Sequence, residues 1–245
     1  MHLETAAATD VGLVRKRNED CVRVRSDGEL GVTILAVADG MGGAPAGDVA
    51  SARAAEVFQQ RALDLLVQEP GDVQRALRTA MLEANAEVLA QARRHAGWQG
   101  MGTTLVAACL RGTNAWVINV GDSRAYHCRG GEAIAITQDH SYVEEQVRAG
   151  RMTAEEAVRS PHRHVLTQAL GGDGPIRPDL FGPLPLEAGE ALLLCSDGLH
   201  GVLRDAEIAA QATGMPSEAV TRLIAAANDR GGPDNITVAL TRLRP

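Results

Sequence analysis

Acidic residues stand at the ends of four apolar runs of this chain, and this repeated arrangement constrains its fold more than any other feature. The four acids are Asp39, Asp122, Asp197 and Asp234. Apolar runs of this length that contain β-branched residues are typical of buried strands. A single Asp-Gly pair usually marks a turn. Four buried carboxylates are costly to leave unpaired, however, so together they predict one shared site that holds cations.

The residue types at these positions favour a hard divalent cation. The candidate ligands are Asp39, Asp122, Asp197, Asp234 and the carbonyl oxygen of Gly40. All of them donate oxygen, which favours Mg²⁺ or Mn²⁺ over zinc. Glycine has no Cβ, so its backbone can approach an ion closely. Two such ions can share a carboxylate and a water that becomes a nucleophile at neutral pH, and a phosphate ester is the natural electrophile.

A basic segment near the N-terminus supplies a candidate for binding phosphate. Arg15 and Arg17 lie just before the acidic pair Glu19 and Asp20. The planar fork of an arginine can hold two phosphate oxygens. We expect Arg15 to be this clamp, with Arg17 as the second candidate. Glu19 and Asp20 are expected to accept hydrogen bonds from metal-bound waters.

The bulk properties restrict the partners. A hydrophobic content of 45% in 245 residues is sufficient for the core of one domain, which we expect to span residues 1–245. The net charge of −7 argues against nucleic acid or an anionic membrane as the main partner. The four cysteines show no C-x-x-C spacing, and no stretch approaches the ~20 apolar residues of a membrane helix. We therefore expect a soluble, cytoplasmic monomer with reduced thiols.

The order of the elements predicts an α+β fold. Two strands are expected between Leu3 and Asp39, around a turn at residues 26–28. Further strands are expected at Thr103–Leu110, Asn114–Val120, Arg124–Cys128, Ala133–Thr137, Ala191–Ser196 and Asn235–Leu240. Helices are expected at Gly47–Glu69, after a cap at Asp72, and over His140–Arg159, Asp205–Ala212 and Ser217–Asn228. Blocks of hairpin-like strands with helices between them indicate antiparallel sheets rather than regular βαβ units.

Eight short motifs cover nearly the whole chain. They lie at residues 9–20, 38–43, 100–104, 119–124, 138–141, 166–171, 195–199 and 232–237. Their types and order are those of the type 2C metal-dependent Ser/Thr protein phosphatases, the PPM family. One such motif alone is weak, whereas the ordered set is very hard to obtain by chance. The chain therefore resembles a bacterial member of this family.

This resemblance implies a four-layer α-β-β-α sandwich, in which two antiparallel sheets are flanked by helix pairs. It implies that Asp39 bridges two metal ions and that Gly40 lends its carbonyl oxygen to one of them. Asp197 and Asp234 would complete the ligands of the first ion. Asp122, together with Asp197, resembles the site of a third ion in bacterial members.

The resemblance also implies a reaction and its partners. Arg15 matches the arginine that holds the substrate phosphate, and residues 141–165 match a flap that affects substrate access. The implied reaction is hydrolysis of phosphoserine or phosphothreonine by attack of a metal-bridging water. The implied partners are phosphorylated proteins, with a cognate bacterial Ser/Thr kinase and its substrates.

The chain departs from the family pattern beside the site. Met41 stands where animal members have a histidine, although bacterial relatives often have methionine there. This removes the usual general acid, so we expect a metal-bound water to protonate the leaving alkoxide, with His140, His162 and His164 as further candidates. Residues 44–46 also differ from the family loop and are expected to alter only the rim of the site.

Two other functions fit the same residues less well. A catalytically weak relative that binds phosphoproteins would be expected to lack some ligand acids, and here all are present. A metal phosphoesterase that acts on small molecules or nucleotides is the other alternative. The aromatic content of 2% provides no base-stacking set and argues against nucleic acid as its substrate.

Overall fold

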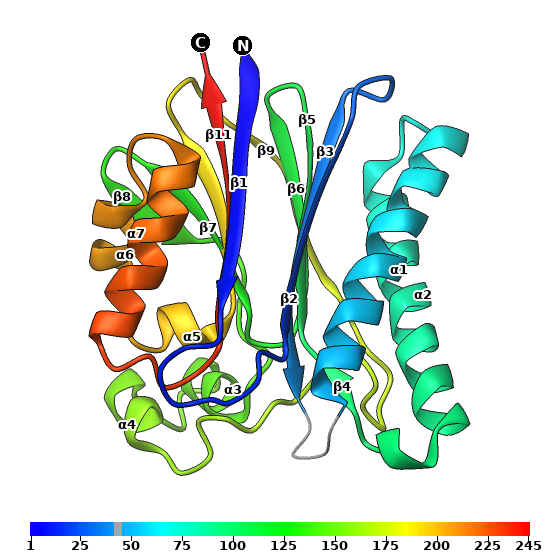
Figure 1. Cartoon of the computed structure of the whole chain (residues 1–245), viewed down its shortest axis with the longest axis vertical. Helices are drawn as coiled ribbons and strands as arrows, with labels where there is room; N and C mark the ends of the chain where they lie inside the picture. Colours follow the sequence, from blue (N-terminus) through cyan, green and yellow to red (C-terminus); the bar gives the residue numbers. More distant parts are fainter. Residues whose placement is uncertain (42–45) are drawn as a thin grey trace.

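Two antiparallel sheets stack face to face in the computed structural model, which describes residues 1–41 and 46–245 (Figure 1). The first sheet has the order β1 (His2–Asp10), β11 (Ile236–Arg244), β10 (Ala191–Cys195), β7 (Arg124–Arg129) and β8 (Glu132–Ala135). The second has the order β2 (Asp20–Asp27), β3 (Val32–Met41), β5 (Leu105–Arg111), β6 (Asn114–Val120) and β9 (Asp179–Pro185), and the short β4 (Gly102–Thr103) pairs with β3.

Helices cover the outer faces of both sheets (Figure 1). On the second sheet lie α1 (Gly47–Gln68) and α2 (Val73–Arg94), and on the first lie α6 (Asp205–Gln211) and α7 (Pro216–Asp229). The remaining short helices are η1 (Ala96–Trp98), α3 (Tyr142–Arg148), α4 (Ala154–Arg159) and α5 (Asp197–His200). The predicted α-β-β-α arrangement is confirmed.

Strand β3 shows why the sequence folds this way. Its side chains alternate between the two faces of the sheet. Ile34 and Ala36 pack in the cluster beneath α1 and α2, whereas Leu35 and Val37 pack in the cluster between the sheets. Both faces are therefore buried, which explains the continuous apolar run that ends at Asp39.

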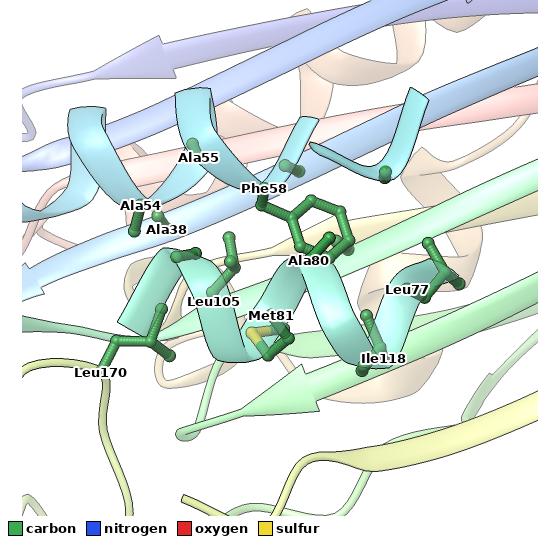
Figure 2. Packing of buried hydrophobic residues seen from close by; sticks show 14 of the residues in the cluster. Ala38, Ala54, Ala55, Phe58, Leu77, Ala80, Met81, Leu105, Ile118 and Leu170 are labelled. Atoms are coloured by element: carbon green, nitrogen blue, oxygen red, sulfur yellow. The ribbon is translucent and has the colours of Figure 1, made fainter. Parts of the chain in front are cut away.

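The layer of α1 and α2 consists mainly of small side chains around Phe58. Ala54 and Ala55 of α1 lie beside Ala80 and Met81 of α2 in the same cluster (Figure 2). Alanine at these positions lets the two helices and the sheet approach closely. The predicted cap of α2 is present, since the Asp72 carboxylate accepts a hydrogen bond from the Arg75 N–H.

Several predicted boundaries were wrong for identifiable reasons. The first 41 residues form three strands rather than two, because the polar segment 11–19 separates β1 from β2. The predicted helix over His140–Arg159 is divided into α3 and α4 at Gly150, which has φ +67°. Thr153 starts α4 with the predicted capping box.

Strand β9 was not predicted from the sequence because it contains Pro183 and Pro185. It is the outermost strand of its sheet, where a residue without an N–H is tolerated. The last strand extends to Arg244, four residues beyond the predicted end at Leu240, because β1 pairs with it along its whole length.

Two further properties of the described chain are the polarity of its helices and the state of its thiols. Throughout the two described ranges, every helix is too short or too polar to cross a lipid bilayer. All four cysteines are free thiols, and Cys109, Cys128 and Cys195 are buried.

Phe58→Ala tests the packing of the helical layer. The side chain is fully buried, and its removal leaves a cavity, so we expect the free energy of unfolding to fall by about 3–5 kcal/mol. Urea unfolding monitored by circular dichroism measures the change. Val67→Ala, at a position 62% exposed on the same helix, is the control and should change stability by less than ~0.5 kcal/mol. Equal effects of the two substitutions would contradict this packing.

Candidate active site

A cavity of about 610 Å³ lies at the end of the sandwich where the predicted acids meet. Its lining includes every predicted ligand and two further predicted site residues: Asp39, Gly40, Asp122, Asp197, Asp234, Arg15 and Glu19. Residues separated by more than 200 positions in the sequence thus lie around one space. The arrangement provides several carboxylates and the guanidinium groups of Arg15 and Arg163 around one volume.

Both sheets contribute acids to the cavity. Asp39 lies near the end of β3 and Asp122 lies two residues after β6, and both strands belong to the second sheet. Asp197 begins α5, just after β10 of the first sheet, and Asp234 lies two residues before β11. The site therefore exists only when the two sheets are stacked.

The end of β3 is fixed by hydrogen bonds from a neighbouring segment. The Thr103 hydroxyl donates to the Asp39 carbonyl oxygen at 2.8 Å, and the Thr104 hydroxyl accepts from the Asp39 N–H at 3.0 Å. The backbone at Gly40 is equally constrained, because a Cβ there would lie 2.2 Å from the carbonyl oxygen of Gly47. Only glycine fits this position.

Asp20 lies deeper in the protein than we expected for a residue that accepts hydrogen bonds from metal-bound water. It pairs with Asp39 across β2 and β3, and it accepts a 2.7 Å hydrogen bond from the Ser196 hydroxyl on its Oδ2. Its Oδ1 and the Oδ1 of Asp197 are buried without a hydrogen-bond partner within the described chain. Buried oxygens of this kind require a donor or a cation.

Burial and mutual repulsion raise the pKa values of these acids. Desolvation is the largest cause in each case, followed for Asp39 by the charges of Asp20 and Asp197. The pKa of Asp39 is raised well above its ordinary value, and that of Asp197 is also raised. The pKa of Asp20 is raised to about 7 and that of Asp122 to about 8. A group of neighbouring acids with strongly shifted pKa values is typical of functional sites.

The donor set fits hard divalent cations. In the ranges 1–41 and 46–245, no three acidic, histidine or cysteine side chains already enclose a point at which an ion would sit. The acids instead surround the cavity, and the unpartnered oxygens of Asp20 and Asp197 are among the groups that a cation would satisfy. Oxygen donors without sulfur favour Mg²⁺ or Mn²⁺.

Of the two predicted arginines, Arg15 is the one that lines the cavity. Its Nη2 donates to Asp234 Oδ2 at 2.7 Å, and about half of its side chain remains exposed (53%). The hydrogen bond that Arg15 donates to Asp234 raises the pKa of the guanidinium group more than burial lowers it. Arg17, the second candidate, does not line the cavity, and its carbonyl oxygen instead accepts a hydrogen bond from the Asn235 amide.

Asn235 was part of a recognised motif, but its structural role was not predicted. Its amide nitrogen donates to the carbonyl oxygens of Val11 and Arg17, and its amide oxygen accepts from the Glu19 N–H at 2.8 Å. Asn235 thereby attaches the N-terminal segment that carries Arg15 and Glu19 to the start of β11. Only the three-dimensional arrangement shows this connection.

The flap, residues 141–165, contributes Arg163 and His164 to the cavity. His162 packs against Tyr142 instead, with ring centroids 5.6 Å apart. His140 is buried, where its Nδ1 accepts from the Gly121 N–H at 3.1 Å and its Nε2 donates to Asp179. Of the three candidate histidines, His164 is therefore the one that reaches the cavity. Arg163 was not predicted, although the basic run His162-Arg163-His164 was a signal for it.

Met41, which stands where animal members of the family have a histidine, also lines the cavity. Residues 44 and 45 of the variant loop lie outside the described residues, and Ala46 is buried.

Asp20→Asn tests the repulsion between the acids. The folded state raises the pKa of Asp20 from 3.8 to about 7, so the native protein binds this proton more tightly than the unfolded chain does. Its contribution to stability is present below pH ~4 and is lost as the pH rises through ~7. The stability of wild type relative to Asp20→Asn should thus fall by about 3 kcal/mol between pH 5 and pH 9 without metal.

Urea unfolding in EDTA at pH 5, 7 and 9 measures this difference. Asp229→Asn removes an exposed carboxylate on α7 and is the matched control. A pH-independent difference between wild type and Asp20→Asn would show that Asp20 does not contribute to the repulsion.

Comparisons with known proteins agree with this geometry. The family model described as protein phosphatase 2C matches residues 15–239. The serine/threonine phosphatase stp of Listeria innocua is 38% identical over 245 residues, which is 98% of this chain and 95% of the relative. The crystal structure of the Mycobacterium tuberculosis serine/threonine phosphatase PstP/Ppp is similar, with a TM-score of 0.84 and 38% identity over 99% of both chains.

A further structure, the catalytic domain of the phosphatase PstP in complex with two manganese ions, is 36% identical, with a TM-score of 0.84 over 99% of both chains. The family match covers most of the sequence, and the two stacked sheets agree with the similarity to these phosphatase structures. The chain therefore belongs to the protein phosphatase 2C family.

Proposed function

We propose that the protein hydrolyses phosphoserine and phosphothreonine in proteins, with Mn²⁺ or Mg²⁺ as cofactor. The observation that carries this proposal is the meeting of Arg15 with the buried acids of both sheets around one cavity. Relatives that match nearly the whole chain are named as a serine/threonine phosphatase and a protein phosphatase. The two manganese ions in a related structure support the choice of metal.

The proposed ligands can be assigned to two metal ions in the centre of the site and to a third ion beside them. Asp39 would bridge two ions, the Gly40 carbonyl would bind one of them, and Asp197 and Asp234 would bind the other. Asp122 and Asp197 would hold the third, while Glu19 and Asp20 would orient water. Divalent ions supply positive charge for phosphoryl oxygens and lower the pKa of a water nucleophile.

The side chains of the protein supply substrate binding and proton transfer. Arg15 would hold two phosphoryl oxygens with its guanidinium fork, and it neutralises charge that develops in the transition state. His164 lines the cavity and is the histidine that can reach a leaving oxygen there, whereas His140 is occupied by Gly121 and Asp179. Water is the other candidate for the general acid.

We extend the proposal to the organisation of the protein. Residues 1–245 would form a single catalytic domain, and residues 141–165 would form a flap that affects access, since Arg163 and His164 lie at the cavity. The protein would act as a cytoplasmic monomer on proteins that a cognate Ser/Thr kinase phosphorylates. Free thiols and a net charge of −7 are consistent with this setting.

Asp39→Asn tests the metal-dependent reaction. Hydrolysis of a phosphothreonine peptide is expected with Mn²⁺ and not with EDTA, and the substitution should lower kcat/KM at least ~100-fold, because it removes the proposed bridging charge. Phosphate release measures the rate, and Asp229→Asn is the control. A folded wild type that binds but does not hydrolyse the peptide would favour a phosphoprotein-binding relative. Faster hydrolysis of nucleotides would favour a small-molecule phosphoesterase.

Arg15→Lys tests the phosphate clamp. Lysine keeps the charge but loses the bidentate fork, so we expect kcat/KM on the same peptide to fall roughly 10-fold or more. Arg17→Lys is the matched control and should change kcat/KM less than ~2-fold, because Arg17 lies outside the cavity. A larger effect at Arg17 than at Arg15 would reverse the assignment.

A further inference from the structure

A second cavity, of about 320 Å³, lies between the edge strand β2 and helix α1, which run side by side (Figure 1). We call it the β2–α1 pocket. Its lining residues are Arg23, Arg25, Glu56, Val57, Gln59, Gln60 and Arg61. Arg23 and Arg25 are two positions apart on β2, so both side chains lie on the face that packs against α1.

The ion pairs in the described chain leave two arginines of this pocket without an acidic partner. Glu56 is held by Arg53 at 2.6 Å, Arg53 also pairs with Glu87 at 2.9 Å, and Arg61 is held by Glu83 and Asp64. Within the described chain, Arg23 and Arg25 form none of these pairs, and Arg25 donates only to the Gln60 amide oxygen at 3.1 Å. This local charge lies on a protein whose net charge is −7.

Two buried donors in the pocket also lack acceptors. The Arg23 Nε and the Gln59 Nε2 have no hydrogen-bond partner among the residues that the structure describes. Gln59 is only 6% exposed, so its amide is enclosed by protein. A buried donor without an acceptor is costly, and a ligand with several acceptor oxygens would remove this cost. The donors and the two guanidinium groups together define an anion site.

We propose that the β2–α1 pocket binds the phosphate of a second phosphorylated residue on the same protein substrate. This inference rests on the proposed function. A phosphate dianion matches the two charges of Arg23 and Arg25, and its three terminal oxygens can accept hydrogen bonds from both arginines and Gln59. A carboxylate offers one charge and two oxygens, and so it matches the pocket less well.

The distance from the catalytic cavity suits two groups on one extended peptide. Strand β2 begins at Asp20, opposite Asp39, and Arg23 and Arg25 lie about 10–17 Å further along it. The same distance along α1, from Gly47 to Glu56 and Gln60, is about 14–20 Å. An extended peptide covers this distance with roughly three to six residues.

The test compares peptides that share one phosphothreonine and differ at a second position three to six residues away on either side. The second residue is phosphoserine, glutamate or alanine. Wild type should show about 10-fold higher kcat/KM for one spacing of the doubly phosphorylated peptide than for the alanine peptide. The double variant Arg23→Gln, Arg25→Gln should lose this preference and hydrolyse the alanine peptide at the wild-type rate.

The variant Arg93→Gln, Arg94→Gln is the matched control, because it removes two arginines at the end of α2, away from the pocket. It should retain the preference. The proposal is overturned if wild type prefers no doubly phosphorylated peptide, if the pocket variant retains the preference, or if it loses activity on all peptides equally. Equal rates for phosphoserine and glutamate would overturn the choice of phosphate.

A binding measurement separates this inference from the proposed function. In the Asp39→Asn background, fluorescence anisotropy of labelled peptides does not depend on turnover. The doubly phosphorylated peptide should bind about 10-fold more tightly than the alanine peptide, and Arg23→Gln, Arg25→Gln should abolish the difference. Absence of hydrolysis of every peptide by wild type would contradict the proposed function, while this difference in affinity would still support the pocket.

Discussion

The repulsion between buried carboxylates at one end of the sandwich is the constraint on which the rest of the structure depends. Asp20, Asp39, Asp122 and Asp197 have raised pKa values because they share a desolvated space. The hydrogen bond that the Asp39 N–H donates to the Thr104 hydroxyl, and the one that the Ser196 hydroxyl donates to Asp20, hold the backbone and side chains in place against this repulsion. A divalent cation that binds these acids relieves their repulsion. The same repulsion that lowers the stability of the metal-free protein therefore raises its affinity for the cation.

The two-sheet architecture is what allows such a cluster to exist. Acids from β3 and β6 belong to one sheet, and those next to β10 and β11 belong to the other. The apolar layer between the sheets, with Leu35, Val37 and Leu194, fixes their separation. Because the positions of the acids follow from the stacking of the sheets, folding and assembly of the site are one event.

The sequence predicted those features that depend on local pattern. Strand β3 and Asp39 were predictable because both faces of the strand are buried and the run ends at the acid. Strand β9 was not predictable, because its prolines argue against a strand although an edge strand tolerates them. The links of Asn235 to Val11 and Glu19 join segments more than 200 residues apart. Likewise, the β2–α1 pocket arises only when β2 packs on α1, so no single motif encodes it.

The ion pair between Arg15 and Asp234 would link the proposed metal site to the proposed phosphate clamp. Arg15 donates through Nη2 to a carboxylate that is also a proposed metal ligand, so the proposed roles in metal binding and phosphate binding meet at this pair. A cation at Asp234 would take over the compensation of that charge. Half-exposed pairs of this kind contribute little stability, so releasing Arg15 costs little. Uncompensated acids repel a phosphate dianion, so the proposed roles of these groups require a cation at the acids when phosphate binds at Arg15.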